Sequence, residues 1–250
     1  MKLSNKIKKS FSLKDNNLLK IDSIAKFFIE IIDLEDLKNI QNFTSTKKIN
    51  FCTLGEGSNV VLPNLLNKVV IKISFNEISI EDNLITVGAG KNWDDFVLWS
   101  LDNGYSGLEN LSGIPGSIGA APIQNIGAYG SEVSDFIEEV ICFDMESNNL
   151  VSFTNEDCNF SYRQSIFQDN DSLIVVKVIF KLTKDFHPNL EYEDLNSLKV
   201  EEISPFIIRK HILKIRRAKI SDPKEHPNVG SFFKNPIISL DELEKIKQTL

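Results

Sequence analysis

Two stretches of the chain carry apolar residues at helical spacing and predict amphipathic helices. The first follows Asn92, a good N-cap, and ends near Gly104, where a left-handed terminal residue belongs. Its apolar face is expected to hold Trp93, Phe96, Val97 and Leu101. The second runs from Ser204, which can cap it, through Pro205 in its first turn to about Lys219. Its buried stripe is expected to be Ile208, Ile212 and Ile215.

Short apolar or alternating runs predict strands in both halves of the chain. Buried strands are expected at residues 49–54, 60–62 and 84–87. Residues 139–154 predict a hairpin that turns at 146–149, and residues 172–183 predict one long alternating strand. A further helix is expected at 241–249. No segment repeats another.

Length and charge narrow the class of protein. The chain has 250 residues, enough for one large or two small domains and for a sizeable core without metals or disulfides. Its net charge of −7 argues against a general nucleic-acid binder, which usually carries a basic face. The richest apolar stretch, residues 25–34, is interrupted by Lys26, Glu30 and Asp33, so no membrane insertion is expected.

The N-terminus and the few cysteines and histidines indicate no special framework. Lysines cluster near the N-terminus without a following apolar stretch, so residues 1–17 predict a solvated, frayed tail rather than a signal peptide. Three cysteines, an odd number at wide spacing, indicate neither disulfides nor a metal site: Cys52, Cys142 and Cys158. The three histidines are also too dispersed for a metal-binding pair. We expect a cytoplasmic monomer without a metal.

Glycine is distributed very unevenly. Of twelve glycines, none precedes Gly55, eleven lie between Gly55 and Gly130, and the last is Gly230. Glycine serves where the backbone needs a positive φ or must approach another group closely. One part of the chain therefore has unusual backbone demands, which favours a ligand site there. The alternative is chance clustering in a loop-rich half.

The first glycine cluster, residues 55–59, follows a predicted strand. Such a loop can point several backbone N–H groups into one concavity, which suits phosphate oxygens. The spacing is not that of a Rossmann fingerprint, because position 60 is Val, and no Gly-Lys-Ser/Thr follows as in a Walker A loop. Taken alone, this cluster indicates a plain tight turn by default.

The densest cluster, residues 112–130, mixes Gly, Ala, Ser and two prolines and carries no large charged side chain. Small residues let a ligand lie against the backbone, and recognition would then rely on N–H and hydroxyl groups. This composition favours a large, partly apolar and partly anionic cofactor. The alternative is an Ω-like loop that packs on itself.

Five sequence blocks together resemble the UDP-N-acetylenolpyruvoylglucosamine reductase (MurB) family. They are LGEGSNVVL, VGAGKNW, GLENLSGIPGSIGAAPIQNIGAYGSEV, CNFSYRQSIF and NVGSFFKNP, at residues 54–62, 87–93, 107–133, 158–167 and 228–236. They occur in the family's order with similar spacing, and the resemblance extends from about Leu18 to the last residue.

This resemblance implies an α+β fold of the PCMH, or vanillyl-alcohol-oxidase, type. Two subdomains would hold non-covalently bound FAD within residues 18–203, with their boundary near residue 70. Residues 204–250 would form a linking helix and the start of an incomplete, substrate-binding third domain. Family members use NADPH to reduce FAD and convert UDP-N-acetylglucosamine enolpyruvate to UDP-N-acetylmuramate, a peptidoglycan precursor. The cofactor-binding residues implied are Gly55, Glu56, Gly57, Ser58, Asn59, Gly116, Ser117, Gly119, Ala120, Ala121, Asn125, Gly127, Ala128 and Gly130.

The resemblance also implies roles in catalysis and substrate binding. Arg163 would polarise the substrate carboxylate, and Ser231 would donate a proton. The alternative for Arg163 is an ion pair with an acidic residue, which its uncharged neighbours make less expected. The implied substrate-binding residues are Tyr162, Tyr192, Lys219 and Asn235. The helix that carries Lys219 is expected to expose a cationic group, of which one or two members would meet a diphosphate: Arg209, Lys210, Lys214, Arg216, Arg217 and Lys219.

Two features leave alternatives open. The chain stops at Leu250, and the catalytic glutamate that the family carries near its C-terminus has no counterpart here, so we expect a fragment or a truncated form. A catalytically impaired flavin-binding protein is therefore one alternative. Another PCMH-type flavin oxidoreductase is a second. Many of those attach FAD through His or Cys, but no His lies in the glycine-rich region and Cys52 is expected in a buried strand.

Overall fold

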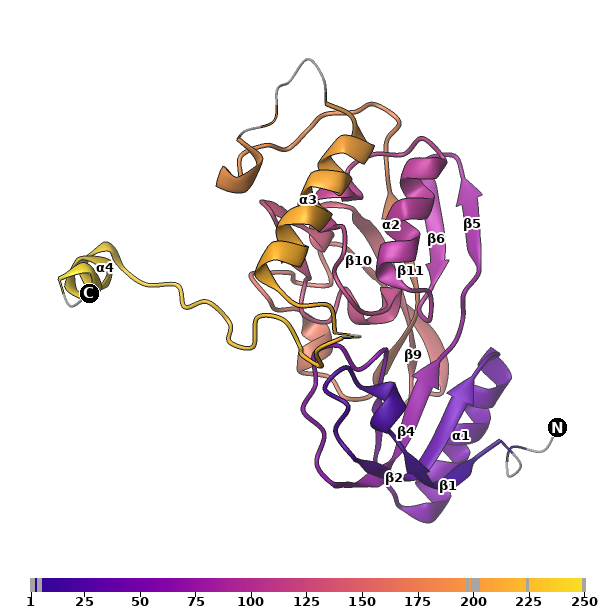
Figure 1. Cartoon of the computed structure of the whole chain (residues 1–250). Coiled ribbons are helices and arrows are strands. Elements are labelled where there is room, and N and C mark those ends of the chain that lie inside the picture. The colour runs from indigo at the N-terminus through magenta and orange to yellow at the C-terminus, as the bar shows by residue number, and fades with distance from the viewer. Residues whose placement is uncertain (1–2, 4–5, 197, 199–202, 224, 249–250) are drawn as a thin grey trace.

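A computed structural model describes residues 3, 6–196, 198, 203–223 and 225–248, which form two sheets with helices packed against them and one helix that lies apart (Figure 1). The first sheet has the strand order β1-β2-β4-β3. Its strands are β1 Lys8–Ser12, β2 Ile24–Ile31, β4 Leu65–Ile73 and β3 Phe51–Thr53. β1 pairs antiparallel with β2, whereas β2 and β3 both run parallel to β4. This parallel arrangement requires the crossover that α1, Leu34–Lys47, provides between β2 and β3.

The prediction of a frayed N-terminal tail at residues 1–17 is wrong for the part that the structure describes from Lys8 onward. β1 adds a strand to the first sheet, and Leu13 is fully buried. Phe11 stacks on Phe28 with ring centroids 4.1 Å apart. The ammonium group of Lys8 lies over both rings, so this lysine covers apolar surface while its charge stays in water. The many lysines in this segment led to the wrong prediction, because they gave no sign that β1 pairs with β2.

The second sheet is antiparallel throughout and has the order β10-β9-β11-β6-β5. Its strands are β5 Ile78–Glu81, β6 Leu84–Gly88, β9 Ile137–Asp144, β10 Asn149–Thr154 and β11 Leu173–Lys181. Helix α2, Trp93–Asp102, packs its aromatic face on this sheet, where the rings of Phe96 and Phe180 lie 4.9 Å apart. The indole N–H of Trp93 donates to the carbonyl of Leu111, which satisfies its one buried donor.

Local signals in the sequence placed several of these elements correctly. Asn92 caps α2 by accepting from the N–H of Asp95, and Gly104 after the helix has φ +78°. The predicted hairpin is β9 and β10, and the long alternating strand is β11. The strand predicted at residues 60–62 is wrong. These residues precede Pro63, which cannot donate to a ladder, and they form no strand.

One hydrophobic core is shared between the two sheets. Ile29 and Ile71 of the first sheet belong to the same buried cluster as Phe143 and Ile174 of the second. The chain passes from one sheet to the other after Ile73, the last residue of β4, and before Ile78, the first residue of β5. This is a few residues beyond the boundary predicted near 70.

The remaining elements follow the second sheet. Helix α3, Pro205–Lys219, is capped by Ser204 and buries Ile208 and Ile212 as predicted. An extended, largely exposed segment leads from it to α4, Leu240–Lys247, which lies away from both sheets and buries none of its described residues (Figure 1). The glycine-rich stretch contains a 3-10 turn at Leu108–Leu111 and a small hairpin of β7, Gly127–Ala128, and β8, Ser131–Glu132. Within the described residues, no helix is long and apolar enough to cross a membrane.

Candidate functional site

Two predicted cofactor loops, which we call the 55–59 loop and the 116–120 loop, face each other across a short distance. A Cβ atom added to Gly55 would lie 2.7 Å from the Oγ of Ser117. A side chain at position 55 would have to displace this hydroxyl, so the two loops lie in direct contact. The structure therefore brings together residues that lie far apart in the sequence.

The N-terminus of α2 joins these loops. Asn92 donates from Nδ2 to the Oε1 of Glu56 at 2.8 Å while its Oδ1 caps the helix. The N–H of Trp93 donates to the carbonyl of Gly116 at 2.9 Å. A Cβ added to Gly116 would lie 3.1 Å from the Oγ of Ser58. The N-terminus of α2 thus fixes the 55–59 loop and the 116–120 loop relative to each other.

The 55–59 loop presents a row of backbone donors. Among the residues that the structure describes, none accepts a hydrogen bond from a backbone N–H of residues 55–59. The loop is half-buried, and the carbonyl of Gly57 is occupied because it accepts from Leu18. Consecutive backbone N–H groups without a protein partner can together bind an anion. The loop therefore fits the phosphate groups of a nucleotide cofactor.

The other predicted cofactor residues lie farther along the glycine-rich stretch. Ala121 is buried in the core beneath the 116–120 loop. Asn125 is also buried and donates to the Oε2 of Glu132 and to the carbonyl of Ser161. The remaining three belong to the β7–β8 hairpin or its turn: Gly127, Ala128 and Gly130. The hairpin thus borders the surroundings of Arg163 rather than the 55–59 loop.

Arg163 is fixed on this hairpin by its guanidinium group. Nη1 donates to the carbonyl of Asn125 at 3.0 Å and Nη2 to that of Gly127 at 2.6 Å. Nη1 also pairs with Glu132 Oε1 at 3.2 Å, so the ion pair considered as an alternative does form. The uncharged sequence neighbours of Arg163 did not indicate this ion pair, because Glu132 comes from another segment of the chain. The guanidinium also lies 4.9 Å from the ring centre of Tyr162.

Two predicted substrate-binding residues, Tyr162 and Asn235, share one hollow of about 380 Å³. Its wall is formed on one side by residues 161, 162 and 164 and on the other by residues 234–237. The ammonium of Lys234 lies 5.5 Å from the Tyr162 ring centre. Ser231 is exposed just before this segment, in a turn where Gly230 has φ +69°. Its Oγ lies 3.5 Å from the carbonyl of Phe233, and the structure shows no contact between it and Arg163.

The other two predicted substrate-binding residues, Tyr192 and Lys219, do not contact each other directly in these interactions, but their contact partners lie close together. Lys219 Nζ pairs with Asp194, whose hydrogen bond raises the pKa of the lysine. The ring of Tyr192 lies edge-on to that of Tyr129, with centroids 5.2 Å apart. Burial raises the pKa of the Tyr129 phenol, and burial lowers that of Arg216 beside it. A lysine, an arginine and two phenols therefore gather at the C-terminal end of α3.

The prediction that α3 exposes all six of its cations is wrong for Arg209, which is buried, and only partly right for Arg216, which is half-buried. Arg209 is 9% exposed and binds both carboxylate oxygens of Asp94, with Nη2 2.8 Å from Oδ2. Arg216 is half-buried against Gly113, where an added Cβ would lie 3.1 Å from its Nε. Asp94 and Asp194 were missed as partners because nothing local in the sequence links them to α3.

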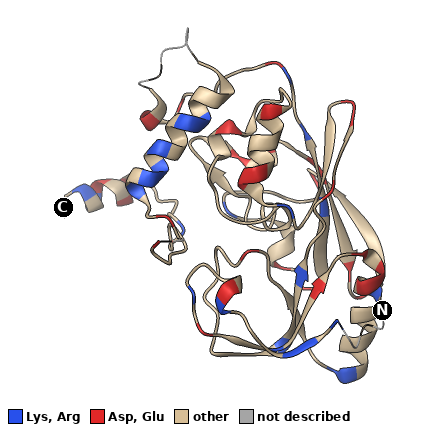
Figure 2. Ribbon diagram, turned by 45° about the vertical axis from the view of Figure 1, so that its right-hand side comes forward, with Lys and Arg blue, Asp and Glu red and all other residues tan. Residues whose placement is uncertain are grey.

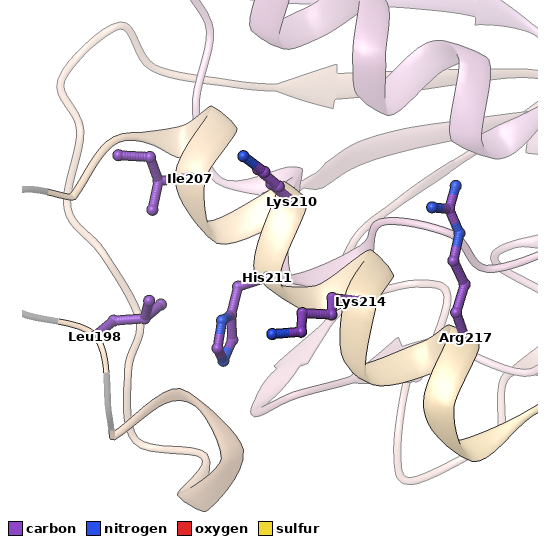
Figure 3. A pocket seen from close by; sticks show the side chains of 6 residues that line it. All are labelled: Leu198, Ile207, Lys210, His211, Lys214 and Arg217. Atoms are coloured by element: carbon purple, nitrogen blue, oxygen red, sulfur yellow. The ribbon is translucent and has the colours of Figure 1, made fainter.

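Three other cations of α3 do face outward. Figure 2 shows basic residues along the helix, and Figure 3 shows the side chains that line a groove on one side of it. The volume of this groove is about 470 Å³. The groove is lined by Leu198, Ile207, Lys210, His211, Lys214 and Arg217. The helix therefore has one cationic face toward the hairpin and another toward solvent.

Comparisons with known proteins show the family and the fold of the chain. A family described as FAD binding domain matches residues 25–148. The chain is 39% identical to the UDP-N-acetylenolpyruvoylglucosamine reductase of Polynucleobacter asymbioticus over 96% of its own length and 72% of that protein. It is 42% identical to the reductase of Flavobacterium johnsoniae, over 96% and 74%.

A solved structure extends the comparison to the fold. The crystal structure of UDP-N-acetylenolpyruvylglucosamine reductase (MurB) from Thermus caldophilus matches with a TM-score of 0.67 and 26% identity, covering 95% of this chain and 79% of that one. The expected α+β, PCMH-type FAD-binding fold is confirmed. With this fold and with relatives about 40% identical over most of their length, the chain belongs to the UDP-N-acetylenolpyruvoylglucosamine reductase (MurB) family of FAD oxidoreductases.

Proposed function

We propose that the protein uses NADPH to reduce UDP-N-acetylglucosamine enolpyruvate to UDP-N-acetylmuramate in peptidoglycan precursor synthesis. Bound FAD supplies the chemistry of accepting hydride from NADPH and passing it to the enolpyruvyl group. The observation that carries the proposal is the row of unpaired N–H groups in the 55–59 loop, closed over by the 116–120 loop. The FAD diphosphate would lie on this row.

Arg163 is suited to stabilise the charge that develops on the substrate carboxylate. Hydride addition to the enolpyruvyl group moves negative charge onto that carboxylate, and a fixed cation placed there lowers the barrier. Two carbonyls and Glu132 hold the guanidinium in place, so little reorganisation is needed during the reaction. The proton that completes the product would then leave the Oγ of Ser231 for the adjacent carbon.

Two sets of residues are proposed to contact the uridine diphosphate part of the substrate. Lys219 and Tyr192 at the end of α3 provide an ammonium and an aromatic face. Tyr162 and Asn235 provide the hollow of about 380 Å³. The ammonium of Lys219 is exposed, so it is accessible for a charge-assisted hydrogen bond to a phosphate.

FAD is proposed to bind without a covalent link to cysteine. Such a link requires a thiolate, and burial raises the pKa of Cys52 and raises that of Cys158 to about 12. Burial raises the pKa of Cys142 as well. All three thiols are therefore protonated near neutral pH. Flavin should be released when the protein is denatured.

The proposal is tested by visible spectroscopy of the purified chain without oxygen. A yellow protein that bleaches with NADPH and regains colour with UDP-N-acetylglucosamine enolpyruvate would establish the reductase. Bleaching without recovery would instead indicate a flavin-binding protein with impaired substrate reduction. A colourless, folded protein that added FAD does not turn yellow would contradict the role given to the 55–59 loop.

A further inference from the structure

The segment that forms the back wall of the 55–59 loop comes from the N-terminus. The N–H of Leu18 donates to the carbonyl of Gly57 at 3.0 Å. A Cβ added to Gly57, whose φ is +65°, would lie 2.2 Å from the carbonyl oxygen of Asn16 and 2.6 Å from the Cα of Asn17. The two backbones are therefore in direct contact, and the position of the loop depends on the shape of this segment.

That shape is fixed by one buried amide. The side chain of Asn17 is 1% exposed. Its Nδ2 donates to the carbonyls of Leu13 and Ile21 at 2.8 and 3.1 Å, and its Oδ1 accepts from the N–H of Ile21 at 3.0 Å. A longer contact of 3.4 Å reaches the carbonyl of Lys14. The side chain thus ties together both ends of the turn between β1 and β2, and only a residue with both donors and an acceptor can do so.

The turn is also anchored to the sheet beneath the loop. Leu13 belongs to the same small core cluster as Leu54, the residue immediately before the 55–59 loop. One end of the turn is therefore held by Leu13 on the sheet, and its middle is held by Leu18 on Gly57. A change in the turn must alter the placement of the donor row, because both anchors are part of the loop's own support.

We propose that Asn17 is a positioning residue for FAD, acting through Gly57 to hold the N–H groups of the 55–59 loop in the arrangement that binds the diphosphate. The inference rests on the FAD placement proposed above. It does not rest on the substrate or the reaction, because Asn17 acts on cofactor retention alone.

The test measures the rate at which the holoprotein releases FAD, followed by the rise in flavin fluorescence after dilution at a temperature well below unfolding. Asn17→Ala should release FAD about tenfold faster, the equivalent of about 1.4 kcal/mol. Asn17→Ser keeps a hydroxyl that can accept from Ile21 or donate to one carbonyl but cannot bridge both carbonyls, so it should fall between the wild type and Asn17→Ala. It also serves as the test if Asn17→Ala does not fold.

Asn155→Ala is the matched control for simple loss of stability. Asn155 also donates from Nδ2 to two carbonyls, those of Ser134 and Ile137, but it lies beside the second sheet, away from the loop. It should lower the Tm comparably and leave the release rate unchanged. If Asn155→Ala released FAD as fast as Asn17→Ala, or if Asn17→Ala released it at the wild-type rate, the proposal would be wrong.

A double-mutant cycle tests the route through Gly57. Gly57→Ala should itself speed release, because its Cβ would collide with the backbone of Asn16. The double variant should release FAD more slowly than expected from multiplying the two single-variant effects, because both substitutions disturb the same contact. If the two effects on the release rate were independent, the proposal that Asn17 acts through Gly57 would be wrong. A chain that retains FAD but does not turn over substrate would contradict the proposed reaction and leave this inference standing, whereas one that cannot bind FAD would contradict both.

Discussion

Asp94 and Arg209 form a two-pronged ion pair that ties the first turn of α2 to the middle of α3. Both terminal guanidinium nitrogens of the arginine, Nη1 and Nη2, donate to the carboxylate, and Asp94 Oδ1 also accepts from the N–H of Gly113. The arginine side chain is 11% exposed and the aspartate 32%. The pair therefore sets how α3, with Lys219 at its end, lies against the glycine-rich stretch.

Replacing one partner should loosen this junction. Asp94→Asn keeps an acceptor for Gly113 but loses the ionic bonds, so the free energy of unfolding should fall by about 2 kcal/mol. Chemical denaturation of the holoprotein measures this. Glu138→Gln is the control, because Glu138 pairs with Lys181 on the surface and should contribute less than about 1 kcal/mol. An equal decrease in the free energy of unfolding in both variants would show that the Asp94–Arg209 pair stabilises the protein no more than a surface ion pair.

The same pair predicts a pH dependence. Burial acts to raise the pKa of Asp94, but the hydrogen bonds from Arg209 and Gly113 outweigh it and the pKa is lowered. A lowered pKa stabilises the folded state above the unfolded value of about 3.9, and that stabilisation is lost as the pH falls through the folded value. The stability difference between wild type and Asp94→Asn should be constant near neutrality and shrink below about pH 4. A difference that grew on acidification would have the wrong sign.

Arg163→Ala should retain flavin and lower kcat by about 100-fold or more, because it removes the cation aimed at the developing charge. The rate at which substrate restores the flavin colour after anaerobic reduction by NADPH measures this step directly. Arg217→Ala, on the outward face of α3, should leave that step unchanged. Wild-type kinetics in Arg163→Ala would remove this residue from the mechanism.

Lys219→Met should raise the KM for the UDP-sugar about tenfold and leave flavin content unchanged, because a charge-assisted phosphate contact is lost. Lys214→Met, earlier in the same helix and lining the outward groove, is the matched control. Steady-state kinetics of both variants separates the two faces of the helix. An equal effect at both positions would indicate a general electrostatic influence rather than a binding site.

Ser231→Ala should still allow NADPH to bleach the flavin but should block formation of the reduced product, because no proton reaches the adjacent carbon. Stopped-flow absorbance follows the first half-reaction, and chromatography of the nucleotide products follows the second. Ser239→Ala, in the cap of α4, should change neither half-reaction. Normal product formation in Ser231→Ala would exclude this hydroxyl as the required acid.

The sequence predicted those parts of the fold that depend on local signals. Asn92 and Ser204 cap α2 and α3 as expected, because a cap is specified by residues within one turn. Periodicity also placed Ile208 and Ile212 in the core. It could not show that Arg209 is buried as well, because the partner that compensates its charge, Asp94, lies 115 residues away in the sequence.

The sequence proposes members for the candidate site but does not show their contacts. Glycine clustering and family resemblance selected the 55–59 and 116–120 loops, and the structure brings them together. The acid that holds Arg163, Glu132, was not identified, since the sequence does not show which segments cross. The contribution of Asn17 was hidden for a similar reason, because a lysine-rich start gave no sign of a buried turn.

The core that spans both sheets has a consequence for how the molecule unfolds. Ile29 and Ile71 are buried by Phe143 and Ile174, so neither sheet can lose its partner without exposing apolar surface. We expect the two sheets to melt in a single cooperative transition, with no populated state in which one remains folded. The cofactor loops are therefore mounted on a rigid frame, and their spacing is set when the chain folds rather than by later closure of one half on the other.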